Sequence, residues 1–337
     1  MTIQALISYV LLAIAGALII LRIRTNPVTQ IRDGVINGDI DKVRQCLKKG
    51  VDVDIEVFGG TPLFLAVYEG NKEMAEFLVN NGADINQGLN VNEGNASNPL
   101  LEAAANNHTE LVEFFLARGA VVGIHFAAFK GDIDTVKKFI EQNVQINSKC
   151  RSGTPLNLAI MGGHKETVSL LLDNGADISL YSAGGRPLDC AIRYNRLEIA
   201  ELLIERGGNI NSGSGSNPLR LAVSQNKLEI LKLLTKKGAD INSSNLLHLS
   251  ASKGYIEIVE FLLRNGLQIN ARDTDGKTPL HHAASKGHLE MAEFLICNGA
   301  KVNSITWLGD TPFSEAKEWN HEEMERLLKS HGGKDVI

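Results

Sequence analysis

The stretch from Asp275 to Ala300 reads DGKTPLHHAASKGHLEMAEFLICNGA and contains the signals for two short helices. Thr278 can cap a helix with its hydroxyl group, and Pro279 suits the first helical position. Gly287 can adopt the left-handed conformation that ends a helix. The sequence therefore predicts a first helix between Thr278 and Gly287, with a buried face of residues at helical spacing: Leu280, Ala283 and Ala284.

A second, amphipathic helix is expected to follow Gly287 and to stop at Gly299. Its buried face would carry Met291, Phe294 and Leu295. One pair of short helices has too little apolar surface to fold alone, so several such pairs must stack against one another.

Units of this kind recur from about residue 29 to the end of the chain. The expected starts of the first helices are Pro62, Pro99, Gly123, Pro155, Pro187, Pro218, Leu246, Pro279 and Pro312, after a degenerate opening unit at Thr29–Gly38. The expected exits of the second helices are Gly50, Gly82, Gly119, Asn143, Gly175, Gly207, Gly238, Gly266, Gly299 and Gly332. These two sets of landmarks agree independently on a period of roughly 33 residues and predict ten units.

The Thr-Pro-Leu-His-x-Ala signature at residues 278–283 and the Gly-Ala-x-Val-Asn exit at residues 299–303 resemble those of ankyrin repeats. The resemblance implies an all-α ankyrin-repeat solenoid of about ten helix-turn-helix units. It also implies short β-hairpin fingers, a finger being the loop between the second helix of one unit and the first helix of the next. Residues 29–337 are expected to form one ankyrin repeat domain that includes N- and C-terminal capping repeats.

Two of these fingers are expected to be shortened. The connections around Val121 and Ser243 contain far fewer residues than the one that precedes Thr278. A gap in the row of fingers is therefore predicted at Val121, and a notch is predicted at Ser243.

Residues 3–21 are uncharged and mostly aliphatic, and as a helix they would be about 28 Å long, close to the thickness of a bilayer core. We expect residues 1–24 to form one N-terminal transmembrane helix with a basic flank, and residues 25–28 to form a linker. Arg22 and Arg24 follow the apolar run and nothing basic precedes it, so the positive-inside bias places the repeats in the cytoplasm. A buried helix is one alternative, and the cleaved signal sequence of a secreted or periplasmic protein is another.

The composition limits which kinds of partner and which chemistry we expect for this protein. The formal net charge is -5, with 34 basic and 39 acidic residues, so no global positive field favours nucleic acid as a partner. The cysteines Cys46, Cys150, Cys190 and Cys297 are dispersed and form no Cys/His cluster, which argues against a zinc site and fits a reducing compartment. Cys46 replaces a leucine of other units and is expected in the core.

No pattern in the chain predicts catalysis. His281 and His248 match the structural histidine that the resemblance implies, and Ser212–Ser216 falls in a finger without the lysine of a phosphate-binding loop. A nucleophile elbow and a dinucleotide fingerprint are both missing from the sequence. We therefore expect no enzyme activity, no cofactor, no metal and no small-molecule substrate, with an unrecognised catalytic site in the groove as the alternative.

The resemblance implies that protein partners bind to a concave face, formed by the finger tips and the C-terminal ends of the first helices. Carried over by register, the candidate partner-binding residues are Phe58, Tyr68, Phe129, Met161, Arg193, Tyr194, Trp307 and Trp319. The same register places Gln225, Lys253 and Lys286 on this face.

Both tryptophans of the chain fall in the last unit. Exposed aromatic side chains are typical of interface hot spots, although Trp307 and Trp319 could instead cover each other at the end of the array. The prediction is a membrane-tethered scaffold or adaptor whose concave groove binds a protein partner.

Overall fold

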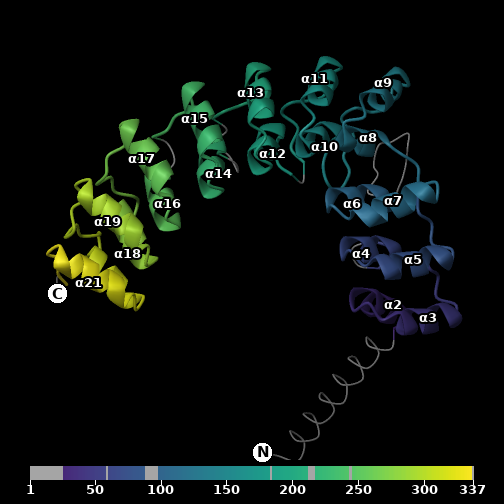
Figure 1. Cartoon of the computed structure of the whole chain (residues 1–337), viewed down its shortest axis with the longest axis horizontal. Helices are drawn as coiled ribbons and strands as arrows, with labels where there is room; N and C mark the ends of the chain where they lie inside the picture. Colours follow the sequence, from purple (N-terminus) through teal and green to yellow (C-terminus); the bar gives the residue numbers. More distant parts are fainter. Residues whose placement is uncertain are drawn as a thin grey trace, which may run out of the picture. The chain divides into compact units, whose positions relative to one another are not determined.

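The computed structural model describes residues 26–57, 60–87, 98–182, 184–211, 217–242 and 245–335. This part of the chain contains twenty α-helices and no β-strand (Figure 1). The helices form ten pairs, as predicted, and we number the repeats one to ten in chain order. Where β-hairpin fingers were predicted, the described chain has tight turns, three of them closed by isolated bridges: Val57 with Gly60, Cys150 with Gly153, and Ser182 with Gly185.

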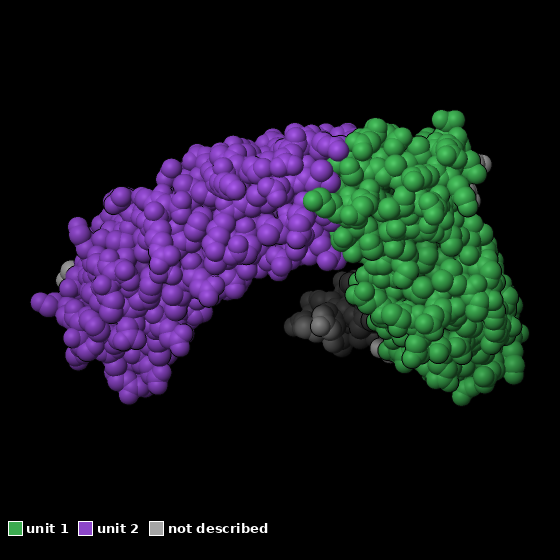
Figure 2. All heavy atoms as spheres, turned by 45° about the horizontal axis from the view of Figure 1, so that its top comes forward, with its two compact units in different colours: residues 1–176 green, residues 177–337 purple. Residues whose placement is uncertain are grey.

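The chain divides into two compact units, Met1–Ala176 and Asp177–Ile337 (Figure 2). Each unit holds five repeats, and the single domain over residues 29–337 stays a prediction. The helices of unit 1 are α2 (Pro27–Ile36), α3 (Ile40–Lys48), α4 (Pro62–Tyr68), α5 (Lys72–Asn80), α6 (Pro99–Ala105), α7 (Thr109–Ala117), α8 (Ile124–Lys130), α9 (Ile133–Glu141), α10 (Pro155–Gly162) and α11 (Lys165–Asp173). Those of unit 2 are α12 (Pro187–Arg193), α13 (Leu197–Glu205), α14 (Pro218–Ser224), α15 (Leu228–Lys236), α16 (Leu246–Lys253), α17 (Ile256–Arg264), α18 (Pro279–Ser285), α19 (Leu289–Cys297), α20 (Pro312–Glu318) and α21 (Glu322–Ser330).

The helix boundaries follow from local sequence signals. Thr61 accepts a hydrogen bond from the Phe64 amide at 3.2 Å, which satisfies one free donor at the start of α4. All ten predicted helix exits have positive φ angles, including the non-glycine exit Asn143. The first helix, α2, begins at Pro27, two residues before the expected start of the repeats, because the Asn26 side chain caps it by accepting from the Val28 amide at 3.0 Å.

The core consists of the predicted faces of the paired helices. In repeat nine, Leu280 and Leu295 are completely buried and Met291 is nearly so, whereas Phe294 is only half-buried. Successive first helices pack against one another, as α16, α18 and α20 do. The small side chains of α18 allow this close approach, and Cys46 is buried in the core of unit 1 as expected.

A histidine at the start of several second helices joins neighbouring repeats. The Nε2 atoms of His288 and His321 lie 3.0 and 3.2 Å from the carbonyl oxygens of Ser252 and Ser285 in the preceding repeats. The imidazole of His321 lies so close to Gly287 that an added Cβ atom there would be 2.9 Å from its Nδ1. Glycine at that position is therefore required by packing as well as by its φ of +68°.

The shortened connection at Val121 is present, since α7 ends at Ala117 and α8 begins at Ile124. Its backbone is held by a 2.8 Å hydrogen bond from the Val121 amide to Asn86 Oδ1. The predicted notch at Ser243 lies outside the described residues, as do the predicted anchor at residues 3–21 and its flank, Arg22 and Arg24. Between Pro27 and Ser330, none of the described helices has the length and apolar character needed to cross a bilayer.

Candidate functional site

The C-terminal ends of the first helices of unit 2 form a row of exposed side chains. First helices α12, α14, α16 and α18 lie along one side of this unit, and second helices α13, α15, α17 and α19 lie along the other (Figure 1). One register position at these ends is occupied by Tyr194, Gln225, Lys253, Lys286 and Trp319, which we call the inner row. Tyr194 is 44% exposed and Trp319 is 56% exposed, so both are large aromatic side chains that face solvent.

Trp319 is held in place by the protein itself. It caps the C-terminus of α20, where its amide donates to the Glu315 carbonyl at 3.2 Å. The ammonium group of Lys286 lies 5.6 Å from the centre of its ring, within the range of a cation–π contact. This contact orders the side chains of two adjacent repeats without burying either.

Trp307 locks the last finger to the preceding one. Its Nε1 donates to the Thr274 carbonyl at 3.0 Å, and its backbone amide donates to the Asp275 carbonyl at 3.1 Å. Gly276 lies directly against the indole, since an added Cβ atom would be 2.8 Å from the ring. Arg272 places its guanidinium 5.1 Å from the ring centre and donates to the Ile305 carbonyl at 2.6 Å.

Trp307 therefore has a structural role in joining two fingers that the sequence did not indicate, and the contacts of Arg272 with the last finger were not predicted. The indole nevertheless remains 66% exposed, and the neighbouring Leu308 is 91% exposed. The two tryptophans make their main contacts with different residues, Trp307 with the preceding finger and Trp319 with Lys286.

In unit 1 the corresponding surface is partly used by the fold. Arg151, from the turn before α10, places its guanidinium 5.1 Å from the ring centre of Phe64 and 5.5 Å from that of Tyr68 on α4. Phe129 and Met161 are half-buried against the core of this unit. Of the candidate partner-binding residues here, Tyr68 keeps the most surface, with 50% exposed, while Phe58 lies outside the described residues.

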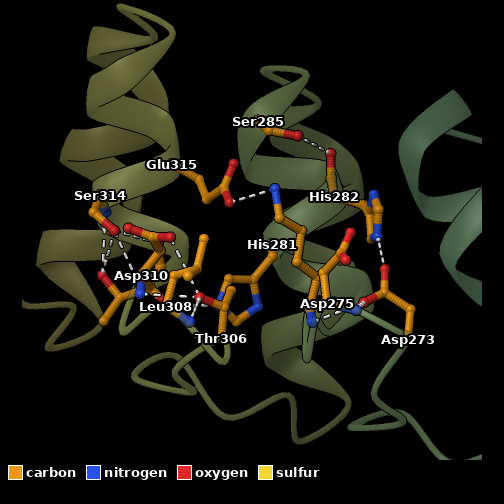
Figure 3. Close-up of polar contacts among 12 residues, drawn as sticks. Asp273, Asp275, His281, His282, Ser285, Thr306, Leu308, Asp310, Ser314 and Glu315 are labelled. Carbon is orange, nitrogen blue, oxygen red and sulfur yellow. Dashed lines mark hydrogen bonds and ion pairs between the residues drawn. The ribbon is translucent and has the colours of Figure 1, made fainter.

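The predicted structural histidine of repeat nine, His281, lies against Asp310 of the following finger (Figure 3). His281 is completely buried, and its Nε2 lies 3.1 Å from the Asp310 carbonyl oxygen. Because a carbonyl only accepts, Nε2 carries the proton and Nδ1 is the acceptor. Nδ1 receives the Thr278 amide at 3.1 Å and lies 2.8 Å from the Thr278 hydroxyl. Burial, and then the nearby positive charge of Lys277, lower the pKa of His281 to about 4.

His248 and His125 occupy the same position in repeats eight and four. Their Nε2 atoms lie 2.9 Å from the Ala271 carbonyl and 3.2 Å from the Ser148 carbonyl, respectively. Both follow shortened connections, and Nδ1 of His248 is buried without a hydrogen-bond partner among the residues that the structure describes. The sequence did not single out His125, although its register relative to Gly123 would have identified it. Burial lowers the pKa of His125 to about 4 and also lowers that of His248.

Two close contacts between polar side chains in the same region maintain the finger. His282 Nε2 lies 2.7 Å from Asp273 Oδ2, and Asp273 Oδ1 accepts the Asp275 and Lys277 amides at 3.0 and 2.9 Å. Burial acts to raise the Asp273 pKa, but these hydrogen bonds outweigh it, so the pKa is lowered. Lys277 Nζ lies 2.6 Å from the buried Glu315 carboxylate. These carboxylates are occupied by structural partners, which does not favour the alternative of a catalytic site.

The last of the predicted partner-binding residues, Arg193, is exposed next to Tyr194 at the end of α12. Within the described ranges, no three histidine, cysteine or acidic side chains lie close enough together to hold a metal ion. The arrangement thus presents a surface of aromatic and cationic side chains on a support of packed helices.

Comparisons with known proteins agree with this architecture. A family model described as ankyrin repeats (3 copies) matches residues 33–123, 124–214, 219–306 and 247–337. The chain is 32% identical over 139 residues to a putative ankyrin repeat protein, FPV031, of fowlpox virus (strain NVSL), covering 36% of this chain and 40% of the relative. It is 34% identical over 136 residues to the putative ankyrin repeat protein YahD of Escherichia coli (strain K12), covering 37% of this chain and 66% of the relative.

A solved structure shares the fold. The crystal structure of the human ASB11 ankyrin repeat domain superposes with a TM-score of 0.55 at 24% sequence identity, covering 64% of this chain and 100% of that one. The chain thus matches less than two thirds of the length of the viral relative, and only its fold is shared with the human domain.

Proposed function

Because the chain belongs to the ankyrin repeat family, we propose that it is a membrane-tethered scaffold or adaptor that binds a protein partner through the inner row and catalyses no reaction. Ankyrin repeat domains are generally protein–protein interaction modules. The observation that best supports the proposal is the exposure of Tyr194 and Trp319 at the two ends of the inner row. Large aromatic side chains that face solvent on a rigid support are typical of interface hot spots.

The mechanism that we propose is preorganisation. The inner-row side chains are carried by helices whose opposite faces are completely buried, as Leu280 and Ala284 are in α18. The contact between Lys286 and Trp319 further restricts two of the side chains that would meet the partner. A surface that is already ordered loses little conformational entropy on binding, so more of the contact energy remains as affinity.

The tether that we propose is the apolar segment at residues 3–21, with the repeats facing the cytoplasm. Anchorage would raise the local concentration of a partner that is itself at the membrane. Carbonate extraction of the full chain tests this, because an anchored protein stays in the membrane fraction with its N-terminus intact. Release by carbonate would contradict the tether, and a mature N-terminus beyond residue 20 would favour the secreted or periplasmic alternative.

Proximity labelling from the intact protein tests partner binding. We expect that Trp319→Ala combined with Tyr194→Ala removes the main labelled partner, because both ends of the inner row are truncated. Leu197→Ala, which changes an exposed apolar residue on second helix α13, is the matched control and should leave the labelling unchanged. Unchanged labelling in the double variant, with helicity preserved, would reject the inner row as the binding surface.

A further inference from the structure

The inner row of unit 2 has a specific chemical order. Along consecutive repeats it reads aromatic, amide, cation, cation and aromatic, from Tyr194 through Gln225, Lys253 and Lys286 to Trp319. Lys253 and Lys286 are exposed, and within the described residues neither forms an ion pair. Elsewhere in unit 2, lysines such as Lys237 and Lys277 do pair with carboxylates. Neither ammonium group is neutralised by a described carboxylate, and that of Lys286 lies over the Trp319 ring, so both can bind an acidic group of a ligand.

The spacing of the row follows from helix packing. The first helices α16, α18 and α20 pack in succession, and packed helices have axes about 8–10 Å apart. A polypeptide in the extended polyproline-II conformation advances about 3.1 Å per residue and brings every third side chain to the same face. One repeat therefore corresponds to about three residues of such a chain, and every third side chain of the chain faces the row.

The residues directly before the two lysines in the chain are uncharged. Ser252 and Ser285 precede them, and both hydroxyls donate to carbonyl oxygens of their own helices, at 2.9 and 3.1 Å. Exposed acidic side chains on this side are Asp275, in the finger before α18, and Glu318, next to Trp319. The five positions of the row themselves carry two positive charges and no negative charge, although the whole chain has a net charge of -5.

We propose that the inner row binds an extended, acidic segment of a partner protein, with acidic residues three positions apart facing Lys253 and Lys286 and an apolar residue three positions further on facing Trp319. This inference rests on the proposed function and specifies its ligand. The spacing provides specificity, because a segment with adjacent acidic residues can place only one of them against a lysine at a time.

A polypeptide suits the row better than a single-stranded nucleic acid. A phosphate backbone carries a negative charge on every nucleotide, and it would meet Asp275 in the finger before α18 and Glu318 next to Trp319. An extended peptide can place uncharged residues opposite these carboxylates. The aromatic ends of the row, Tyr194 and Trp319, provide apolar contacts for its side chains.

The test uses the full-length chain in detergent and three labelled probes. The spaced peptide carries leucine at its first and tenth positions and glutamate at its fourth and seventh, with serine and glycine elsewhere, so it fits the row in either direction. The scrambled peptide has the same composition with the glutamates adjacent, and a single-stranded oligonucleotide of similar length represents nucleic acid. Fluorescence anisotropy gives the affinities.

We expect the spaced peptide to bind about fivefold or more tightly than the scrambled one, with an affinity that falls as salt is raised. Lys253→Gln and Lys286→Gln should each weaken the spaced peptide by about threefold, as for exposed ion pairs. Lys236→Gln on second helix α15 removes the same charge outside the row and should have no effect.

Equal affinity for the two peptides, no binding of either, or insensitivity to both inner-row lysine variants would overturn the inference. So would tighter binding of the oligonucleotide than of the spaced peptide. If partner labelling in cells still depends on Trp319, such results reject only the acidic peptide ligand and leave the proposed function standing. A failure of the ligand inference can therefore be told apart from a failure of the proposed function.

Discussion

Repeats eight and nine of unit 2 place a histidine at the same position but support it differently. In both, Nε2 donates to a carbonyl in the following finger, at 2.9 Å for His248 and 3.1 Å for His281. A full finger precedes His281 and supplies Thr278 to its Nδ1, whereas Nδ1 of His248 has no partner among the described residues. Asn245, which precedes α16, has a left-handed φ of 48° and makes no capping hydrogen bond with its side chain.

This difference shows what a finger contributes to the fold. A full finger fixes the tautomer and orientation of its histidine, which in turn holds the next finger. In repeat nine, Lys277 of the finger also reaches Glu315 in the first helix of repeat ten. In repeat eight, His248 keeps its hydrogen bond to the next finger, but no described residue of the shortened connection before it supports its Nδ1. Full fingers should therefore couple neighbouring repeats more strongly than shortened ones.

The largest expected effect is the loss of the better supported histidine. His281→Ala should lower the free energy of unfolding by about 3–4 kcal/mol, because it leaves a cavity and unpaired polar groups at Thr278 and Asp310. His248→Ala should cost about 2 kcal/mol, because no described residue forms a hydrogen bond with Nδ1 of His248 that the variant would lose. Urea unfolding followed by circular dichroism measures both free energies. Equal losses in the two variants would contradict the stronger support of His281.

The next effect is the dependence of stability on pH. Folding lowers the pKa of His281 from 6.5 to about 4, so the folded state favours the neutral ring. The stability from this ring is complete above pH 6.5 and is lost as the pH falls toward 4, by about 3 kcal/mol. His281→Gln should reduce the pH dependence of the unfolding free energy between pH 6.5 and 4.5, while His125 and His248 keep their contributions to it. An unchanged slope in the variant would show that His281 titrates normally.

A smaller effect is expected from the residue that supports Nδ1. Thr278→Val should cost about 1–2 kcal/mol, since it removes both the capping hydroxyl and its contact with the histidine. Thr61→Val is the matched control, because Thr61 caps α4 where no histidine follows, and it should cost about 1 kcal/mol or less. Thermal unfolding of the two variants gives the difference, and a larger loss for Thr61→Val would contradict the role given to the finger.

The smallest expected effect lies at the shortened connection. Asn245→Gly should raise the free energy of unfolding by about 0.5 kcal/mol, because glycine adopts a positive φ without steric cost. Asn298→Gly, at a residue with a φ of -94°, should lower it by a similar amount. A decrease in the melting temperature of the Asn245 variant would indicate that the asparagine side chain stabilises the turn.

The helix boundaries could be predicted from the sequence because their signals are local. Proline after a capping residue marks the start of α18, and a left-handed residue such as Gly299 or Asn143 marks an exit, wherever the segment lies in the fold. The exposure of Tyr194 and Trp319 was also predictable by register, because every repeat has the same geometry.

Contacts between distant repeats could not be predicted in this way. Arg151 reaches Phe64 and Tyr68 across repeats of unit 1, and Arg272 clamps Trp307 in the next finger. Such contacts depend on the length of each connection and on how the repeats curve, and neither follows from a single period. For the same reason, the half-buried state of Phe129 against the core of unit 1 was not foreseen.

The most direct test of the central claim is photo-crosslinking from the inner row in cells. A benzophenone amino acid replaces Trp319 in one variant of the full chain and Lys236, on second helix α15, in another. If the partner binds to the inner row, a discrete crosslinked protein is expected from position 319 and none from position 236. Crosslinking of the same protein from both positions, or from position 236 alone, would contradict the claim that the inner row is the binding surface.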